Sequence, residues 1–217
     1  MSKENRPTRR IVILIGLALA IGVPLLPFKK ILAGFPSLDP HFAGEVFVWA
    51  LTALVLLYIL IVERRPVSSI GLRRPDWKTL AFGIGGGGVL LAGVGAFIAI
   101  LLPLLHMQRN AGALQQMMAL PYWSRVLIVT RAAVCEEILF RGYGIERLQE
   151  LTGSRFVAGA VTLAAFTFAH LSYWGWTQVI IAGSAGFVLT VLYLWRRDLM
   201  SNMIAHFVTD GVGILLQ

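Results

Sequence analysis

The sequence predicts an all-α fold: a polytopic transmembrane helix bundle of about seven to eight helices, with its functional site within the bundle. The first observation is composition, because 57% of the 217 residues are hydrophobic and only 14% are charged, far from the balance of soluble domains. The second is that apolar runs of near-spanning length recur along the whole chain. The third is that the longest polar connection, residues 63–78, is too short to bury a core of its own.

Seven apolar runs approach or exceed the length of about 20 residues that crosses the hydrocarbon of a bilayer. In chain order they cover residues 11–28, 43–62, 80–105, 122–143, 156–171, 177–195 and 199–216. The first follows a basic tail as a signal peptide would, but it is long and has no clear small-residue cleavage site, so we expect a retained helix. The third is long and glycine-rich enough to contain a break. We divide the chain into a basic cytoplasmic tail, residues 1–10, and a single transmembrane domain, residues 11–217.

The basic residues lie mostly between the apolar runs, and their distribution predicts the topology. With the N-terminus inside, 13 of the 19 Lys and Arg residues fall on the inner side, as the positive-inside rule requires. They are Lys3, Arg6, Arg9, Arg10, Arg64, Arg65, Arg73, Arg74, Lys78, Arg147, Arg155, Arg196 and Arg197. Lys29, Lys30, Arg109 and Arg125 fall outside. The net charge of +8 therefore indicates contact with anionic lipid on the cytoplasmic side and no nucleic-acid partner.

The glycine tract at residues 83–88, GIGGGG, predicts close helix packing. Gly83 and Gly87 have the GxxxG spacing that lets a second helix approach closely. Small residues continue this pattern at Gly88, Ala92, Gly95 and Ala99. The tract lacks the preceding strand and the lysine of phosphate-binding loops, so we expect a packing face and no nucleotide site.

The fourth run is unusual because it contains four charged residues, Arg131, Glu136, Glu137 and Arg141. Each costs about 3 kcal/mol near the bilayer centre on the insertion scale, roughly 12 kcal/mol in all. The good apolar residues within residues 123–140, about ten at roughly 0.5 kcal/mol each, recover only about 5 kcal/mol. This helix therefore needs polar partners from other helices or a water-filled cavity.

Ionisable side chains in two other apolar runs are candidate partners. His170 ends the fifth run in FTFAHLSYWGW, and His206 and Asp210 lie in the last run in SNMIAHFVTDG. His206 and Asp210 are four residues apart, as are Phe166 and His170, which places each pair on one helical face. Counted along straight helices, His170 falls about 10 Å nearer the outer surface than Glu136. We therefore expect the uncharged connection after His170 to turn below the surface around a water-filled cavity.

Spacing along the fourth run separates the two glutamates. Glu137 and Arg141 are i and i+4 in the favourable order, so we expect an ion pair along the helix. Glu136 lies about 100 degrees around the helix from Glu137 and five residues from Arg141. We therefore expect Glu136 to be a free, desolvated carboxylate that can take a proton from water. A nucleophile is one interpretation of the adjacent Cys135, but a lone cysteine in an apolar run is more often a packing residue.

The side chains that carry chemistry fall into three short motifs. They are EExxxR at Glu136, Glu137 and Arg141, FxxxH at Phe166 and His170, and His206 with Asp210. In this order, each inside an apolar run, they resemble the CAAX protease and bacteriocin-processing family of intramembrane proteases, also called the Abi or type II CAAX prenyl endopeptidase family. The resemblance spans roughly the C-terminal half of the chain, with its motifs within residues 135–210.

The resemblance implies an endopeptidase whose catalytic residues are Glu136, His170, His206 and Asp210. Glu136 matches the base that activates the attacking water, with His170 assisting, and His206 matches a group that stabilises the oxyanion. Better-known members carry Asn where this chain has Asp210, and an acid cannot donate to an oxyanion unless it is protonated. We therefore expect Asp210 to hold His206 in its cationic or correctly oriented form.

The remaining motif residues, Glu137, Arg141 and Phe166, would be structural members of the site. Two alternatives stay open. The first is a metal-dependent version of the same protease, because Glu136, His170 and His206 are a common zinc or iron ligand set. We prefer the version without metal or other cofactor, since the HExxH spacing is absent.

The second alternative is a non-catalytic membrane immunity factor or scaffold. A transporter would predict similarity between the two halves of the chain, and none is visible. The expected partners of the protease are a peptide or membrane-protein substrate, whose prenylation the residues do not indicate. By analogy, a short chain with a basic inner side indicates the bacterial cytoplasmic membrane.

Overall fold

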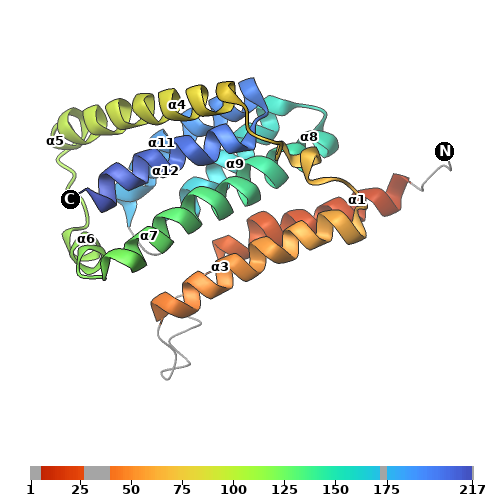
Figure 1. Cartoon of the computed structure of the whole chain (residues 1–217), viewed down its shortest axis with the longest axis horizontal. Coiled ribbons are helices and arrows are strands. Elements are labelled where there is room, and N and C mark those ends of the chain that lie inside the picture. The colour runs from red at the N-terminus through yellow and green to blue at the C-terminus, as the bar shows by residue number, and fades with distance from the viewer. Residues whose placement is uncertain (1–5, 27–39, 172–174, 217) are drawn as a thin grey trace.

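The computed structural model describes residues 6–26, 40–171 and 175–216, and it confirms the all-α bundle (Figure 1). Within these ranges every regular element is a helix. Three of the described helices are long and apolar enough to cross a membrane: Phe42–Val62, Trp77–Leu104 and Trp176–Arg196. Two shorter apolar helices, Arg155–Ala169 and Leu199–Leu215, pack among them.

Several helices are continuous through short stretches of wider or tighter winding. The elements of the first half are α1 (Arg6–Leu17), η1 (Ala18–Gly22), η2 (Val23–Leu25), α3 (Pro40–Leu57), η3 (Tyr58–Val62), η4 (Val67–Ile70), α4 (Trp77–Ala96), η5 (Phe97–Leu101) and α5 (Leu102–Leu104). The second half contains α6 (Ala111–Met118), α7 (Tyr122–Arg131), η6 (Ala132–Ile145), α8 (Glu146–Thr152), α9 (Arg155–Ala169), α11 (Trp176–Arg196) and α12 (Leu199–Leu215).

All seven apolar runs are helical where they are described, and the structure adds two features. A short helix, α6, precedes the fourth run, and the helix of the fourth run continues through α8 to Thr152. The break considered for the third run is wrong, because Trp77–Leu104 is one helix with a widened turn at η5. The part of the connection after His170 on which the predicted turn depends, residues 172–174, lies outside the described residues.

The glycine tract packs α4 against α12, as its spacing predicts. A Cβ atom added at Gly83 would lie 2.6 Å from Cβ of Ile204, and one at Gly87 would lie 2.8 Å from Cβ of Val208. The two helices can therefore approach closely only because these positions lack side chains. The prediction that this close-packing face continues at Gly88 is wrong, because a Cβ added there would meet no atom within 4 Å.

The two helices of this seam also begin together. Asp76 caps α4 by accepting a hydrogen bond from the Thr79 backbone N–H at 2.8 Å, and Asp198 caps α12 by accepting from the Ser201 N–H at 3.4 Å. The Thr79 hydroxyl donates to Asp198 at 2.8 Å, which joins the two caps. The capping residues satisfy backbone donors that a helix start leaves unpaired.

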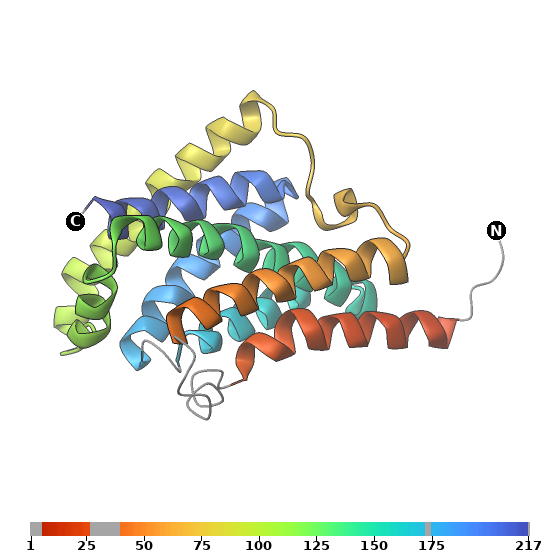
Figure 2. The same ribbon diagram turned by 60° about the horizontal axis from the view of Figure 1, so that its bottom comes forward.

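The N-terminal helices form a pair on one side of the bundle. Figure 2 shows α1 and α3 lying side by side, and the Tyr58 hydroxyl donates to the backbone oxygen of Val12 at 2.7 Å. This pair contacts η6 and α7 through α3, and η6 and α8 through the α1 helix and its continuation. It therefore borders the segment that carries the EExxxR motif.

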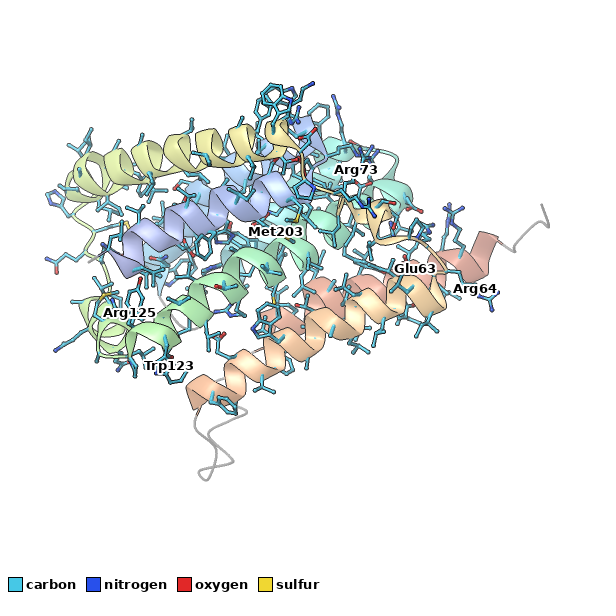
Figure 3. The ribbon with its side chains drawn as sticks, in the orientation of Figure 1. Glu63, Arg64, Arg73, Trp123, Arg125 and Met203 are labelled. Atoms are coloured by element: carbon cyan, nitrogen blue, oxygen red, sulfur yellow. The ribbon has the colours of Figure 1, made fainter. Side chains whose placement is uncertain are left out.

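Charged loops gather at one end of the bundle, where α1 begins and α8 ends. Figure 3 shows Glu63, Arg64 and Arg73 toward this end and Trp123 and Arg125 toward the other. The structure thus brings together loops that the topology assigns to one side. Which side of the membrane this end faces stays a prediction.

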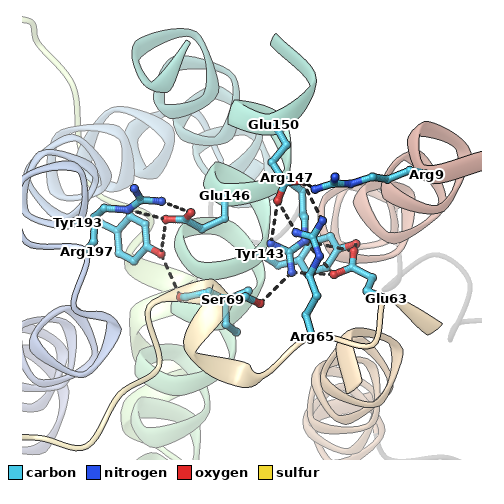
Figure 4. Close-up of polar contacts among 11 residues, drawn as sticks. Arg9, Glu63, Arg65, Ser69, Tyr143, Glu146, Arg147, Glu150, Tyr193 and Arg197 are labelled. Atoms are coloured by element: carbon cyan, nitrogen blue, oxygen red, sulfur yellow. Dashed lines mark hydrogen bonds and ion pairs between the residues drawn. The ribbon is translucent and has the colours of Figure 1, made fainter. Parts of the chain in front are cut away.

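Ion pairs link the helices and loops at this charged end (Figure 4). Glu150 of α8 pairs with Arg9 of α1 at 3.0 Å and with Arg65, which follows η3. The buried guanidinium of Arg147 pairs with Glu63 at 2.6 Å and with Glu150 at 3.3 Å. These contacts tie α1, the loop after η3 and α8 into one network.

Candidate active site

The two adjacent glutamates lie in η6, a π-helical stretch that continues α7 without interruption. A π-helix closes hydrogen bonds from residue i to i+5, so residues five apart approach one face, as they do not in an α-helix. The prediction treated this run as an α-helix. The wider winding changes which charged residues of the run can meet.

Glu137 is the centre of a fully buried polar cluster. Its side chain is 0% exposed and accepts from Arg141 at 2.8 Å, which confirms the predicted ion pair. His206 of α12 contacts the same carboxylate oxygen through Nδ1 at 2.9 Å. The Asn202 amide, also on α12, donates to the other oxygen at 3.2 Å. Three donors thus compensate a carboxylate that burial would otherwise make very costly.

The Phe166 ring lies beside Arg141 and both histidines. The Arg141 guanidinium stacks over the ring with its carbon 4.0 Å from the centroid, and it also donates to the Gly186 carbonyl at 3.3 Å. The rings of His170 and His206 have centroids 4.7 Å and 6.5 Å from that of Phe166. Phe166 therefore packs against both histidines and the arginine, and a change of its size would move all three.

Glu136 is not free, and the prediction of an unpaired carboxylate is wrong. Nη1 of Arg131, five residues earlier, lies 2.8 Å from Oε1 of Glu136. Nε of the same guanidinium lies 3.3 Å from both carboxylate oxygens of Glu45 on α3. The i, i+5 contact is the kind that π-helical winding permits, and a count of α-helical turns does not anticipate it.

His170 lies beside Glu136, so the offset of about 10 Å expected from straight helices does not separate the two groups. Nε2 of His170 is 4.0 Å from Oε2 of Glu136. Nδ1 lies 2.8 Å from the backbone oxygen of Phe166. A carbonyl only accepts, so Nδ1 carries a proton, and in the neutral ring Nε2 is then an acceptor that faces the carboxylate.

His206 is held between two carboxylates, one on each ring nitrogen. Nδ1 contacts Glu137, and Nε2 lies 3.4 Å from Oδ2 of Asp210. Ionised carboxylates accept and do not donate, so both ring nitrogens must carry protons to satisfy them, which favours the imidazolium. Asp210 in turn interacts electrostatically with His170 and Arg131. The third motif thus adjoins both glutamate clusters.

Exposure divides these groups into an inner and an outer set. The side chains of Glu137 and Arg141 are 0% and 1% exposed. Those of Glu136, His170 and Asp210 are 15%, 20% and 33% exposed. The outer set is therefore partly exposed at the surface of the bundle, whereas the inner set is enclosed by protein.

The donor set proposed for a metal does not fit the geometry. Among the described residues, no group of three or more His, Cys, Asp or Glu side chains is placed to hold a metal ion. Of the set Glu136, His170 and His206, the last has both ring nitrogens directed at carboxylates. A metal ligand needs a nitrogen lone pair, so this histidine would first have to leave its partners.

Glu45, Asn202 and Arg131 are parts of the site that the sequence analysis did not assign to it. Glu45 is an acid within an apolar run, the feature that singled out Glu136, and Asn202 precedes His206 by four residues. The sequence therefore contained a signal for Glu45 and for Asn202, whereas the contact of Arg131 with Glu136 depends on the π-helical winding. Cys135 is fully buried, as the packing interpretation expects.

One comparison with known proteins matches the segment that contains the three motifs. No curated protein and no solved structure gave a significant match to the chain. The family model described as type II CAAX prenyl endopeptidase Rce1-like matches residues 118–212. This segment contains all three motifs and excludes Glu45, and at family level the match supports an endopeptidase of the CAAX-protease type. The predicted resemblance to the type II CAAX prenyl endopeptidase family is thereby confirmed for residues 118–212.

Proposed function

We propose that the protein is an intramembrane endopeptidase that hydrolyses a peptide bond with a water molecule activated by Glu136 and His170. The family match supports the reaction class. The observation that carries the mechanism is the pair of acceptors formed by Oε2 of Glu136 and Nε2 of His170, 4.0 Å apart. The two groups come from η6 and from the end of α9.

The separation of these acceptors suits one bridging water. At 4.0 Å the two atoms are too far apart for a direct hydrogen bond. A water about 2.8 Å from each would donate one proton to each acceptor, with its lone pairs directed away from both. As the water attacks the carbonyl carbon, Glu136 takes one proton and His170 orients the other. When the peptide C–N bond then breaks, Glu136 returns its proton to the leaving amine. The phenylalanine carbonyl bonded to Nδ1 keeps His170 in the required tautomer.

The oxyanion is assigned to His206. Its Nε2–H faces Asp210 at 3.4 Å, longer than a good hydrogen bond, so this proton can be shared with a substrate oxygen at small cost. The imidazolium, held by Glu137 on its other nitrogen, presents a positive charge where negative charge develops. Asp210 keeps the ring charged and oriented and does not itself donate.

Glu137, Arg141 and Phe166 support this arrangement without touching the reacting atoms. Arg141 neutralises Glu137, and Glu137 fixes the orientation of the His206 ring. Phe166 packs against the rings of both His170 and His206. Their role is positioning.

For the setting, we propose an integral protein of a bacterial cytoplasmic membrane with its N-terminus inside. The charged end of the bundle then faces the cytoplasm and anionic lipid. The substrate would be a peptide or a membrane protein that reaches the outer set of side chains. None of the described contacts favours a non-catalytic immunity factor or scaffold.

The test is cleavage of a peptide library by detergent-purified protein. We expect Glu136→Gln and His170→Ala to lose roughly 100-fold or more of the rate, the range of general acid–base catalysis. Glu150→Gln and His106→Ala are matched controls at exposed positions away from the site, and they should retain activity. Equal cleavage by wild type, Glu136→Gln and His170→Ala would refute the hydrolase and favour the scaffold. Loss of cleavage on adding a chelator would favour the metal-dependent version.

A further inference from the structure

We propose that Glu45 of α3, which lies outside the segment matched by the family model, is a positioning residue that holds Arg131 and keeps Glu136 an effective base. This inference rests on the proposed function. It assigns to the N-terminal helix pair a part in the chemistry of the C-terminal half.

The contact geometry shows how one guanidinium serves two carboxylates. Arg131 presents Nη1 to a single oxygen of Glu136 at 2.8 Å and Nε to both oxygens of Glu45 at 3.3 Å. The contact with Glu45 leaves Oε2 of Glu136 directed toward His170. Without Glu45, Arg131 would be free to turn both of its edges to Glu136, as guanidinium–carboxylate pairs prefer. Oε2 of Glu136 would then be bonded to Arg131 and no longer available to accept a hydrogen bond from the water.

Charge supports the same conclusion. The groups that face Glu136 are Arg131 from α7, Glu45 from α3 through Arg131, and His170 at the end of α9. Arg141 and Cys135 of η6 also interact with it electrostatically. Asp210 of α12 interacts with Arg131 and His170. A single unopposed cation beside a carboxylate stabilises its charged form and makes it a poorer proton acceptor. Glu45 lies on the other side of this guanidinium and offsets part of its positive charge.

A purely structural role for Glu45 makes a different prediction. The contact also joins α3 to α7, so its loss could lower stability alone. In that case the pH profile of the remaining activity would match that of the wild type. A role in positioning instead requires the acid limb of the pH profile to shift along the pH axis.

The test compares Glu45→Gln, Arg131→Gln and the double variant by their pH–rate profiles. In Glu45→Gln the acid limb of kcat should move to lower pH by about 1 unit, because Arg131 is left unopposed, and the plateau should fall roughly three- to tenfold with KM unchanged. Arg131→Gln should move the limb to higher pH. The double variant, which removes both charges, should return the limb toward its wild-type position.

The conservative variant Glu45→Asp keeps the charge and should show an intermediate shift. If Glu45→Gln does not fold, the shift of Glu45→Asp relative to the wild type tests the same coupling. A wild-type profile in Glu45→Gln, or in Glu45→Asp where Glu45→Gln does not fold, would overturn the role of Glu45 and leave the proposed function intact. A wild-type protein that does not cleave, or cleavage unaffected by Glu136→Gln, would instead overturn the proposed function.

Discussion

Replacement of Gly83 by alanine should destabilise the seam between α4 and α12, whereas the same change at Gly88 should not. A Cβ at Gly83 would lie 2.6 Å from Cβ of Ile204 and 3.2 Å from the backbone oxygen of Ser201. Neither atom is the end of a flexible side chain, so the helices must separate. At Gly88 the added methyl would meet no atom within 4 Å.

The magnitude follows from two opposing effects. Glycine to alanine inside a helix stabilises by about 0.5–1 kcal/mol, because alanine loses less conformational freedom on folding. Overpacking a close contact costs about 1–3 kcal/mol. Because the helix effect is common to Gly83→Ala and Gly88→Ala, their difference measures packing alone. For a domain of this size, that difference corresponds to roughly 2–12 °C in Tm.

The assay is thermal unfolding of both variants in the same detergent, followed by circular dichroism. We expect Gly83→Ala to unfold below Gly88→Ala by this margin, and Gly87→Ala, whose Cβ would lie 2.8 Å from Cβ of Val208, to resemble Gly83→Ala. Equal midpoints for Gly83→Ala and Gly88→Ala would refute the close approach of the two helices at this position.

Two further predictions concern charged groups. Arg141→Met should lower Tm by roughly 10 °C, since removing one partner of a buried ion pair costs about 3–5 kcal/mol. Arg64→Met, at an exposed position, is the control. An unchanged Tm for Arg141→Met would contradict the buried pair. Burial acts to raise the pKa of Glu150, but the hydrogen bond and charge of Arg65, with Arg147 and Arg9, outweigh it and hold that pKa below its usual value. This carboxylate therefore stabilises the fold above its unfolded pKa of about 4.3, and its contribution is lost as pH falls through the lower folded value. The difference between the unfolding midpoints at neutral and at acid pH should be smaller in Glu150→Gln than in the wild type. An equal difference in the two proteins would contradict this contribution.

The architecture could be predicted from the sequence because hydrophobic length and small-residue spacing act locally. Each apolar run is helical over its described residues, and Gly83 and Gly87 pack as GxxxG spacing requires. Gly88 did not follow, because it lies about 100 degrees around α4 from Gly87, outside the face that α12 covers. The contact itself continues past Gly88, since Leu90 lies in one buried cluster with Ala205 of α12.

The candidate site was predicted in part. The Glu137–Arg141 pair is formed along one helix, and spacing was sufficient to anticipate it. The partners of Glu136 were missed for two reasons. Arg131 reaches it only through π-helical winding, and Glu45 reaches Arg131 from a helix 86 positions away in the chain. Contacts between distant segments leave no periodic trace in the sequence.

The three hydrogen-bond donors around Glu137 also have a consequence for biogenesis. On the ribosome, this glutamate is made 65 and 69 residues before Asn202 and His206, the two α12 side chains that complete its shell. Arg141, four residues later, is the partner available in the meantime. A carboxylate that enters lipid incompletely paired is costly, so we expect this helix to settle in the bilayer only after α12 has been made.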